Sequence, residues 1–286
     1  MLSLTENEID DLLSGIGDNK NSSNLGFFSR PFRINHRDKE LIVKLYLPVK
    51  KYSSVSSIIE NHNEYIKALK STGIKIPDTL ITVRKLKNKF KLIIIQESFK
   101  DVELLRNLVQ SAYGNKLTDL CEKIFDDTLK FWKNRKESMD IGFHPTLRNY
   151  SLHNSELYYF DTFPPMLMNQ RKLNRLILMM SPYGGLVNKF IPLWLINRVS
   201  DEYYNLDKMF IGIVGSCCRL KPDDAHKILA FSNEFVKRSA LLSKKEKESI
   251  LKLIQAPPNL SKIWLLIRKL SGNTGKPNLK AMHVKK

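Results

Sequence analysis

The stretch that decides the fold is His144-Pro-Thr-Leu-Arg-Asn149-Tyr-Ser-Leu-His-Asn-Ser-Glu-Leu-Tyr-Tyr-Phe-Asp161-Thr-Phe-Pro-Pro165. It reads as a loop, a short strand, a polar turn at 153–155, a second short strand and an acidic residue at the end of that strand. We therefore expect the amide of Asn149 and the carboxylate of Asp161 to lie on adjacent turns. One amide oxygen and one carboxylate are the kind of ligands that a hard cation prefers.

In pattern and spacing, this stretch resembles the catalytic loop and metal-binding aspartate of the protein-kinase superfamily. Asn149 stands where the loop asparagine of that family would be. Asp161 stands where the metal-bridging aspartate of the D-F-G triplet would be, although Asp161-Thr-Phe-Pro-Pro replaces the triplet. Because phosphoryl transfer in this family uses Mg²⁺ across the nucleotide phosphates, the resemblance implies ATP and Mg²⁺ as cofactors, with Asn149 and Asp161 as metal ligands.

Two residues nearer the N-terminus extend the resemblance. Lys44 lies in an apolar strand at 41–46, where an unpaired ammonium group is costly. Glu64 follows in a predicted helix at 55–70. In kinase-like proteins, a strand lysine paired with a glutamate of the next helix holds the nucleotide phosphates, so the resemblance implies this role for Lys44 and Glu64. A lysine of an edge strand that points to solvent would give the same pattern.

The apolar strand at 91–97 ends in Gln96-Glu97 and leads into a helical region. It resembles the hinge between the kinase lobes, where backbone N–H and C=O groups bind the edge of adenine. The resemblance therefore implies a cofactor-binding position at Glu97.

The sequence departs from the kinase pattern at two places. His144 stands five positions before Asn149, where the family has a catalytic aspartate that accepts a proton from the substrate hydroxyl. A neutral imidazole can accept a proton, so His144 is the candidate catalytic base, or it is a structural residue in a protein that binds nucleotide without turnover. The glycine-rich phosphate loop would fall near 25–30, where only Gly26 is a glycine.

The order of elements predicts an α+β protein with two unequal lobes, a small β-rich one and a large helical one. The resemblance implies that this is a protein-kinase-like fold, and the chain looks most like the branch that includes the aminoglycoside and choline kinases. The resemblance covers about Leu25 to Leu270. It implies a small molecule with a hydroxyl group as the phosphate acceptor. The predicted parts are an N-terminal helix and linker at 1–24, a β-rich nucleotide-binding lobe at 25–97, a helical lobe at 98–270 that contains the catalytic-type loop at 140–165, and a basic tail at 271–286.

Composition limits the class of protein and the compartment that the sequence is compatible with. The chain has 286 residues, 42% of them hydrophobic and 27% charged, which is typical of a folded globular protein. The N-terminal residues show no signal-peptide pattern, and the three cysteines include no C-x-x-C pair, so we expect a cytoplasmic protein. The longest apolar stretch is broken by Pro and Gly, so we expect no transmembrane segment.

The net charge of +18 favours polyanions such as nucleic acid, acidic lipid headgroups or phosphorylated small molecules. Lysines that are dispersed over solvated faces would give the same charge, and the basic runs are dispersed along the chain. A nucleic-acid-binding protein is the third hypothesis, after the kinase-like enzyme and the catalytically impaired pseudokinase-like scaffold. Only the charge supports it, because no helix-turn-helix, zinc finger or aromatic RNA-binding strand is evident.

Overall fold

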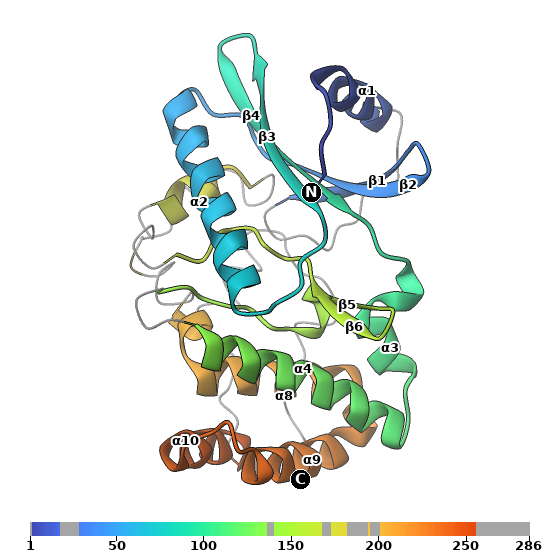
Figure 1. Cartoon of the computed structure of the whole chain (residues 1–286), viewed down its shortest axis with the longest axis vertical. Helices are drawn as coiled ribbons and strands as arrows, with labels where there is room; N and C mark the ends of the chain where they lie inside the picture. The colour runs from blue at the N-terminus through green and yellow to red at the C-terminus, as the bar shows by residue number, and fades with distance from the viewer. Residues whose placement is uncertain are drawn as a thin grey trace.

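The structure is a computed structural model that describes residues 2–17, 29–135, 140–167, 173–181, 194 and 201–255. Two lobes follow each other along the long axis in Figure 1, a β-sheet lobe above and a helical lobe below. This is the predicted α+β, two-lobed architecture. The expected phosphate-loop residues at 25–28 and the basic tail at 271–286 lie outside the described residues.

The small lobe is built on one antiparallel sheet with the strand order β1-β2-β4-β3. Polar turns join β1 to β2 and β3 to β4, with Arg37 and Lys87 at positive φ. Two of these strands were predicted, at 41–46 and 91–97, close to where they form. The strands are β1 (Arg30–His36), β2 (Lys39–Leu45), β3 (Thr79–Leu86) and β4 (Lys89–Glu97).

A helix covers each face of this sheet (Figure 1). On one face, α1 (Glu6–Gly17) buries Ile9 and Leu12 against the sheet. On the other face lies α2 (Tyr52–Ser71), which packs Val55 and Ile58 against β4. Because side chains alternate along a strand, Val43 of β2 faces α1 and its neighbour Lys44 lies on the face of α2.

The large lobe is helical, with a core centred on α4 and α8. Phe125 of α4 packs against Phe210 of α8 with ring centroids 4.6 Å apart, and against Phe235 of α9 at 5.2 Å. Its helices are α3 (Leu105–Ser111), α4 (Asn115–Asn134), α8 (Leu206–Leu220), α9 (Ala225–Arg238) and α10 (Lys244–Gln255). The short helix α5 (Asn174–Met179) packs Ile177 against the face of the sheet that α2 covers.

The predicted hairpin lies between the lobes as β5 (Tyr150–His153) and β6 (Glu156–Tyr159). Short 3₁₀ turns complete the described structure at Asp101–Glu103, Leu147–Asn149, Asp201–Tyr204 and Pro222–Asp224. Among the described residues, no helix combines the length and the apolar character needed to cross a bilayer.

Candidate functional site

The β5–β6 hairpin brings the two predicted metal ligands together. Tyr150 pairs with Tyr159 at the base of the hairpin. One step beyond, the backbone N–H of Phe160 donates to the carbonyl of Asn149 at 2.9 Å. Asp161 is the next residue, so it leaves the hairpin directly beside Asn149, as the sequence predicted.

The side chain of Asn149 is held in one orientation. It is buried, with 8% of its surface exposed, and its Nδ2 donates to the backbone carbonyl of His144 at 2.9 Å. Because the amide nitrogen is used in this way, the Oδ1 atom is the one available to bind a cation.

Lys44 connects the sheet to this hairpin. Its Nζ donates to the carbonyl of Phe160 at 3.3 Å and to Oε1 of Gln96 at 3.4 Å. The lysine of β2 therefore reaches the residue that precedes Asp161. The sequence had left open a lysine that points to solvent, and the structure excludes this alternative.

Lys44 and Asp161 act on each other through their charges. Burial lowers the pKa of Lys44, and the negative charge of Asp161 opposes this shift. Burial also raises the pKa of Asp161, with Lys44 opposing. Desolvation is the larger effect for both groups, so one lysine does not fully compensate the Asp161 carboxylate. An additional cation beside Asp161 would relieve this cost.

The donor set of Asn149 and Asp161 fits Mg²⁺. Mg²⁺ keeps several waters and takes one or two protein oxygens together with substrate phosphates. Within the described part of the chain, no three His, Cys, Asp or Glu side chains gather to hold a metal. A two-ligand magnesium site that a nucleotide completes is therefore the type of metal site that these residues can form.

The expected pair between Lys44 and Glu64 is not formed. Glu64 is exposed, whereas the buried face of α2 carries Ile58, His62 and Tyr65. Because successive residues of an α-helix are rotated by about 100°, a residue two positions after buried His62 points to the opposite side. The position that faces the hairpin from α2 is His62, not Glu64.

His62 was not predicted from the sequence, and it binds the segment that follows Asp161. Its Nε2 lies 3.0 Å from Oγ1 of Thr162, and both residues are buried. Burial and, to a lesser extent, the charge of Lys44 lower the pKa of His62 to about 3, so the ring is neutral. Its signal in the sequence was a histidine at helical spacing from the apolar Ile58 and Tyr65.

Two more contacts fix the small lobe against this region. The hydroxyl of Tyr65 donates to the carbonyl of Gly142 at 2.9 Å, which ties α2 to the loop before His144. Phe163 packs its ring against Tyr46 of the small lobe, with centroids 4.5 Å apart. The site is therefore held from both lobes by side chains that pack away from solvent.

Glu97 differs from the predicted hinge position in one respect. Its backbone N–H donates to the carbonyl of Asp78 at 2.9 Å, and the N–H of Ser98 donates to the carbonyl of Glu40 at 3.0 Å. Oε1 of the Glu97 carboxylate lies 3.9 Å from Nζ of Lys39. The backbone N–H of Glu97 is thus already hydrogen-bonded within the protein. Glu97 therefore has no free backbone donor to bind the edge of adenine.

His144 lies beside Asn149, one of the two predicted metal ligands. Its ring packs on Tyr203 with centroids 4.4 Å apart, and its Nδ1 is 3.4 Å from Nδ2 of Asn149. Burial lowers the pKa of His144 to about 4, so the imidazole is neutral at neutral pH. Because an amide nitrogen only donates, Nδ1 is the acceptor in this contact and the ring proton lies on Nε2.

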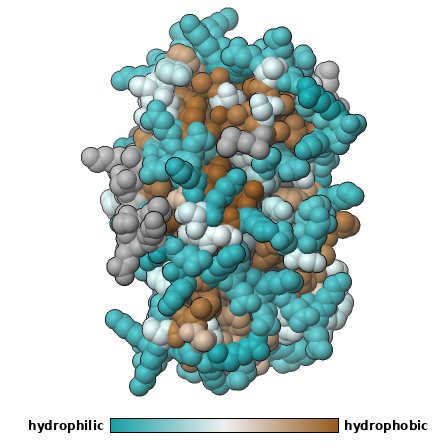
Figure 2. Space-filling model, in the orientation of Figure 1, coloured by the Kyte–Doolittle hydropathy of each residue, from teal (hydrophilic) through white to brown (hydrophobic). Residues whose placement is uncertain are grey.

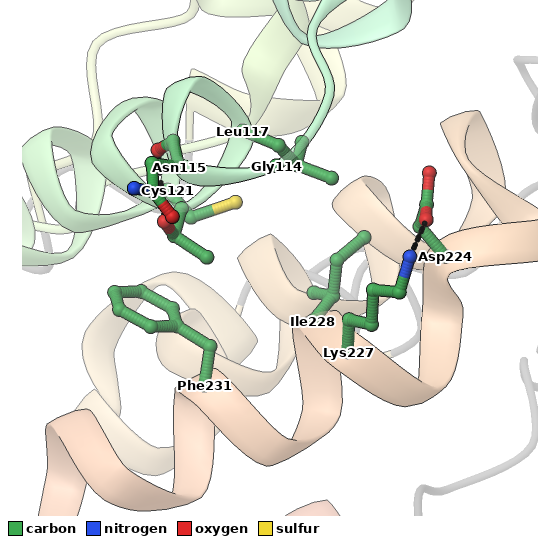
Figure 3. A pocket seen from close by; sticks show the side chains of 9 residues that line it. Gly114, Asn115, Leu117, Cys121, Asp224, Lys227, Ile228 and Phe231 are labelled. Carbon is green, nitrogen blue, oxygen red and sulfur yellow. Dashed lines mark hydrogen bonds and ion pairs between the residues drawn. The ribbon is translucent and has the colours of Figure 1, made fainter.

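A cavity of about 210 Å³ lies elsewhere, between α4 and α9 in the helical lobe (Figure 3). Its wall is mostly apolar, with Leu117, Cys121, Ile228 and Phe231, and an ion pair between Lys227 and Asp224 lies at one side. None of the predicted site residues lines it.

Comparison with known proteins gives a family and a set of structural neighbours. A family model described as "Family of unknown function (DUF6206)" matches residues 13–275. No curated protein matches the sequence. The solved structure of WaaP in complex with acyl carrier protein is similar with a TM-score of 0.47 and 12% identity, over 94% of this chain and 99% of that chain. The MAP kinase LmaMPK10 from Leishmania major is similar with a TM-score of 0.34 and 10% identity, over 87% of this chain and 82% of that chain.

Proposed function

This chain belongs to the DUF6206 family of unknown function, and we propose that it is a phosphotransferase that binds ATP with Mg²⁺ between its lobes. The acceptor is a hydroxyl group of a small molecule. One observation carries the proposal: Lys44 of the sheet reaches the carbonyl of Phe160, and this residue joins Asn149 to Asp161. The strand lysine of one lobe therefore lies beside the backbone of the segment that carries the amide of Asn149 and the carboxylate of Asp161.

Each of these residues has a distinct role. Oδ1 of Asn149 and the carboxylate of Asp161 are the ligands for Mg²⁺, and Lys44 binds the phosphates of the nucleotide. When bound, Mg²⁺ neutralises the charge that develops on the transferred phosphoryl group. Lys44 requires a negative partner in addition to Asp161 because it is largely withdrawn from water, and a phosphate supplies one.

His144 acts on the acceptor hydroxyl. With Nδ1 turned to Asn149, the Nε2–H group is the one that can donate a hydrogen bond to the acceptor oxygen. Its low pKa makes it a weak proton acceptor at neutral pH, which favours orientation of the acceptor over deprotonation.

Two other observations favour a second function, that of a nucleotide-binding protein without turnover. A general base with a pKa of about 4 accepts a proton poorly, and Glu64 does not pair with Lys44. Under this alternative, the site binds nucleotide and Mg²⁺ but no phosphate reaches an acceptor.

Thermal unfolding with millimolar ATP and Mg²⁺ tests the binding step. A ligand at one hundred times its dissociation constant adds about 2.7 kcal/mol, or several degrees for a domain of this size. We expect this shift in the wild-type chain and in Asp119→Ala, an exposed carboxylate of α4, but not in Asp161→Ala. If no nucleotide shifts the melting temperature, or if the shift survives in Asp161→Ala, the proposed site is wrong.

The variant His144→Asp separates the two functions. Phosphate transfer to a panel of hydroxyl compounds is followed with radiolabelled ATP. Activity in the wild type that falls in His144→Asp supports a working histidine. Activity that appears only in His144→Asp supports a decayed enzyme that still binds nucleotide.

A further inference from the structure

Five exposed lysines and three exposed apolar side chains gather at the end of the small lobe where β3 turns into β4. We call this surface the basic tip. Its apolar members are unusually open, with 44% of Leu47, 52% of Tyr52 and 46% of Leu86 exposed. The lysines of the basic tip are Lys50, Lys51, Lys85, Lys87 and Lys89.

Two parts of the chain come together to form the basic tip. Val49 and Phe90 exchange backbone hydrogen bonds of 2.9 and 2.7 Å, which lays the segment before α2 along the start of β4. Tyr52 then packs edge-on against Phe90 with ring centroids 5.3 Å apart. In Figure 1, the β3–β4 turn forms the upper end of the molecule and α2 begins beside it.

The positive charge of the basic tip is uncompensated. The segments 47–57 and 84–91 contain no Asp or Glu. Within the described part of the chain, none of the five lysines forms an ion pair. The nearby Arg84 differs, because Asp10 of α1 lies 2.9 Å from its Nε and Glu6 also contacts it. The acidic side chains of α1 thus neutralise Arg84 and leave the lysines of the tip free.

We propose that the basic tip binds the surface of an anionic lipid bilayer. A lysine near such a surface contributes about 1 kcal/mol, which is about fivefold in affinity. The exposed side chains of Leu86 at the turn, of Leu47 before α2 and of Tyr52 at the start of α2 enter the boundary between headgroups and acyl chains. The lysine stems lie along this boundary with their ammonium groups in water. Figure 2 shows this end of the molecule as largely hydrophilic, with apolar surface interspersed.

An anionic bilayer fits the basic tip better than a nucleic acid does. The tip has lysines rather than the forked guanidinium groups that bind phosphates in pairs. Its apolar members include the aliphatic Leu47 and Leu86, which gain by leaving water at a lipid boundary but offer no flat ring for a base to stack on. This proposal does not depend on the proposed phosphotransferase function.

The basic tip and the candidate site share one strand. Lys89 begins β4, and Ile94 of the same strand pairs with Lys44. Five residues of strand span about 17 Å, so a bilayer bound at the tip stays clear of the site.

Vesicle flotation of the full chain tests the proposal. Vesicles of phosphatidylcholine with one-third phosphatidylserine are compared with vesicles of phosphatidylcholine alone. We expect the wild type to float only with the anionic vesicles, and 0.5 M NaCl to release it. The variant Lys85→Gln/Lys87→Gln/Lys89→Gln should lose about 100-fold in partitioning, at about fivefold for each lysine.

A matched control removes the same charge elsewhere. Lys116, Lys123 and Lys252 are exposed on helices of the large lobe, and their triple change to Gln should cost less than about threefold. The variant Leu86→Ser should weaken binding without changing its dependence on salt. All variants change exposed residues, and an unaltered melting temperature verifies that each is folded.

Three outcomes would overturn the proposal. The first is a wild-type chain that floats with neither type of vesicle. The second is a control triple variant that loses as much binding as the tip variant. The third is tip-dependent binding to an RNA or DNA duplex without binding to anionic vesicles, which would assign the basic tip to nucleic acid instead.

Discussion

Nε2 of His62, on α2, lies 3.0 Å from Oγ1 of Thr162, the residue that follows Asp161. This contact joins the helix of the small lobe to the segment that carries the candidate metal ligand. The resemblance to kinases predicted that Glu64 of the same helix would pair with Lys44, but the structure has the contact of His62 instead. A neutral, buried hydrogen bond therefore positions α2 in this protein.

The first prediction concerns how the stability depends on pH. The pKa of His62 is about 3 in the folded chain and near 6.5 when unfolded, so the unfolded chain binds more protons at low pH. The contribution of His62 is fully present above about pH 6.5 and is lost as the pH falls toward 3. Between pH 7.5 and pH 5 this amounts to about 2 kcal/mol of unfolding free energy.

Urea unfolding of His62→Gln at several pH values measures this effect. The variant should lose less stability on acidification than the wild type does. His226→Gln changes an exposed histidine of α9 and should behave as the wild type. Equal pH dependence in His62→Gln and the wild type would show that His62 is not held neutral.

The second prediction concerns Glu64. Because its side chain is exposed on α2, Glu64→Gln should change the unfolding free energy by less than about 0.5 kcal/mol. The thermal shift with ATP and Mg²⁺ should also remain. Lys44→Met should abolish that shift, since its ammonium group lies at the site. Loss of the shift in Glu64→Gln would mean that α2 rotates when nucleotide binds.

The third prediction concerns the two charges of the site. Without ligand, Lys44→Met and Asp161→Asn should each destabilise the chain by about 2 kcal/mol, because each leaves a partly buried charge without its partner. The double variant should be at least as stable as the wild type, since it removes both desolvated charges. Urea unfolding of the four proteins gives the coupling energy, and simple additivity of the two single changes would contradict the proposed interaction.

The fourth prediction concerns α1. Ile9 is buried against the outer face of the sheet with 4% of its surface exposed. Ile9→Ala should therefore cost about 2–3 kcal/mol of unfolding free energy. Asp11→Ala, an exposed position of the same helix, is the control and should cost less than about 0.5 kcal/mol. A cost of less than about 0.5 kcal/mol for Ile9→Ala would show that packing of α1 against the sheet does not stabilise the fold.

The sequence by itself determined the elements and the order in which they occur. Apolar stretches predicted the strands β2 and β4, and the sequence also predicted α2. The proximity of Asn149 and Asp161 was also predictable, because they flank one hairpin and a turn of fixed length brings its ends together. These are local relations, and local spacing is enough to define them.

The tertiary structure alone decided which side chain of α2 reaches the site. His62 and Glu64 are two residues apart on one helix, and both are polar. Which of them faces Lys44 depends on how α2 is rotated against β4 and the hairpin, and that rotation is set by packing of Ile58 and Tyr65 against residues far away in the chain. Likewise, the N–H of Glu97 is taken by Asp78, a partner that no local pattern specifies. Long-range packing, and not local spacing, therefore fixed the contacts of the site.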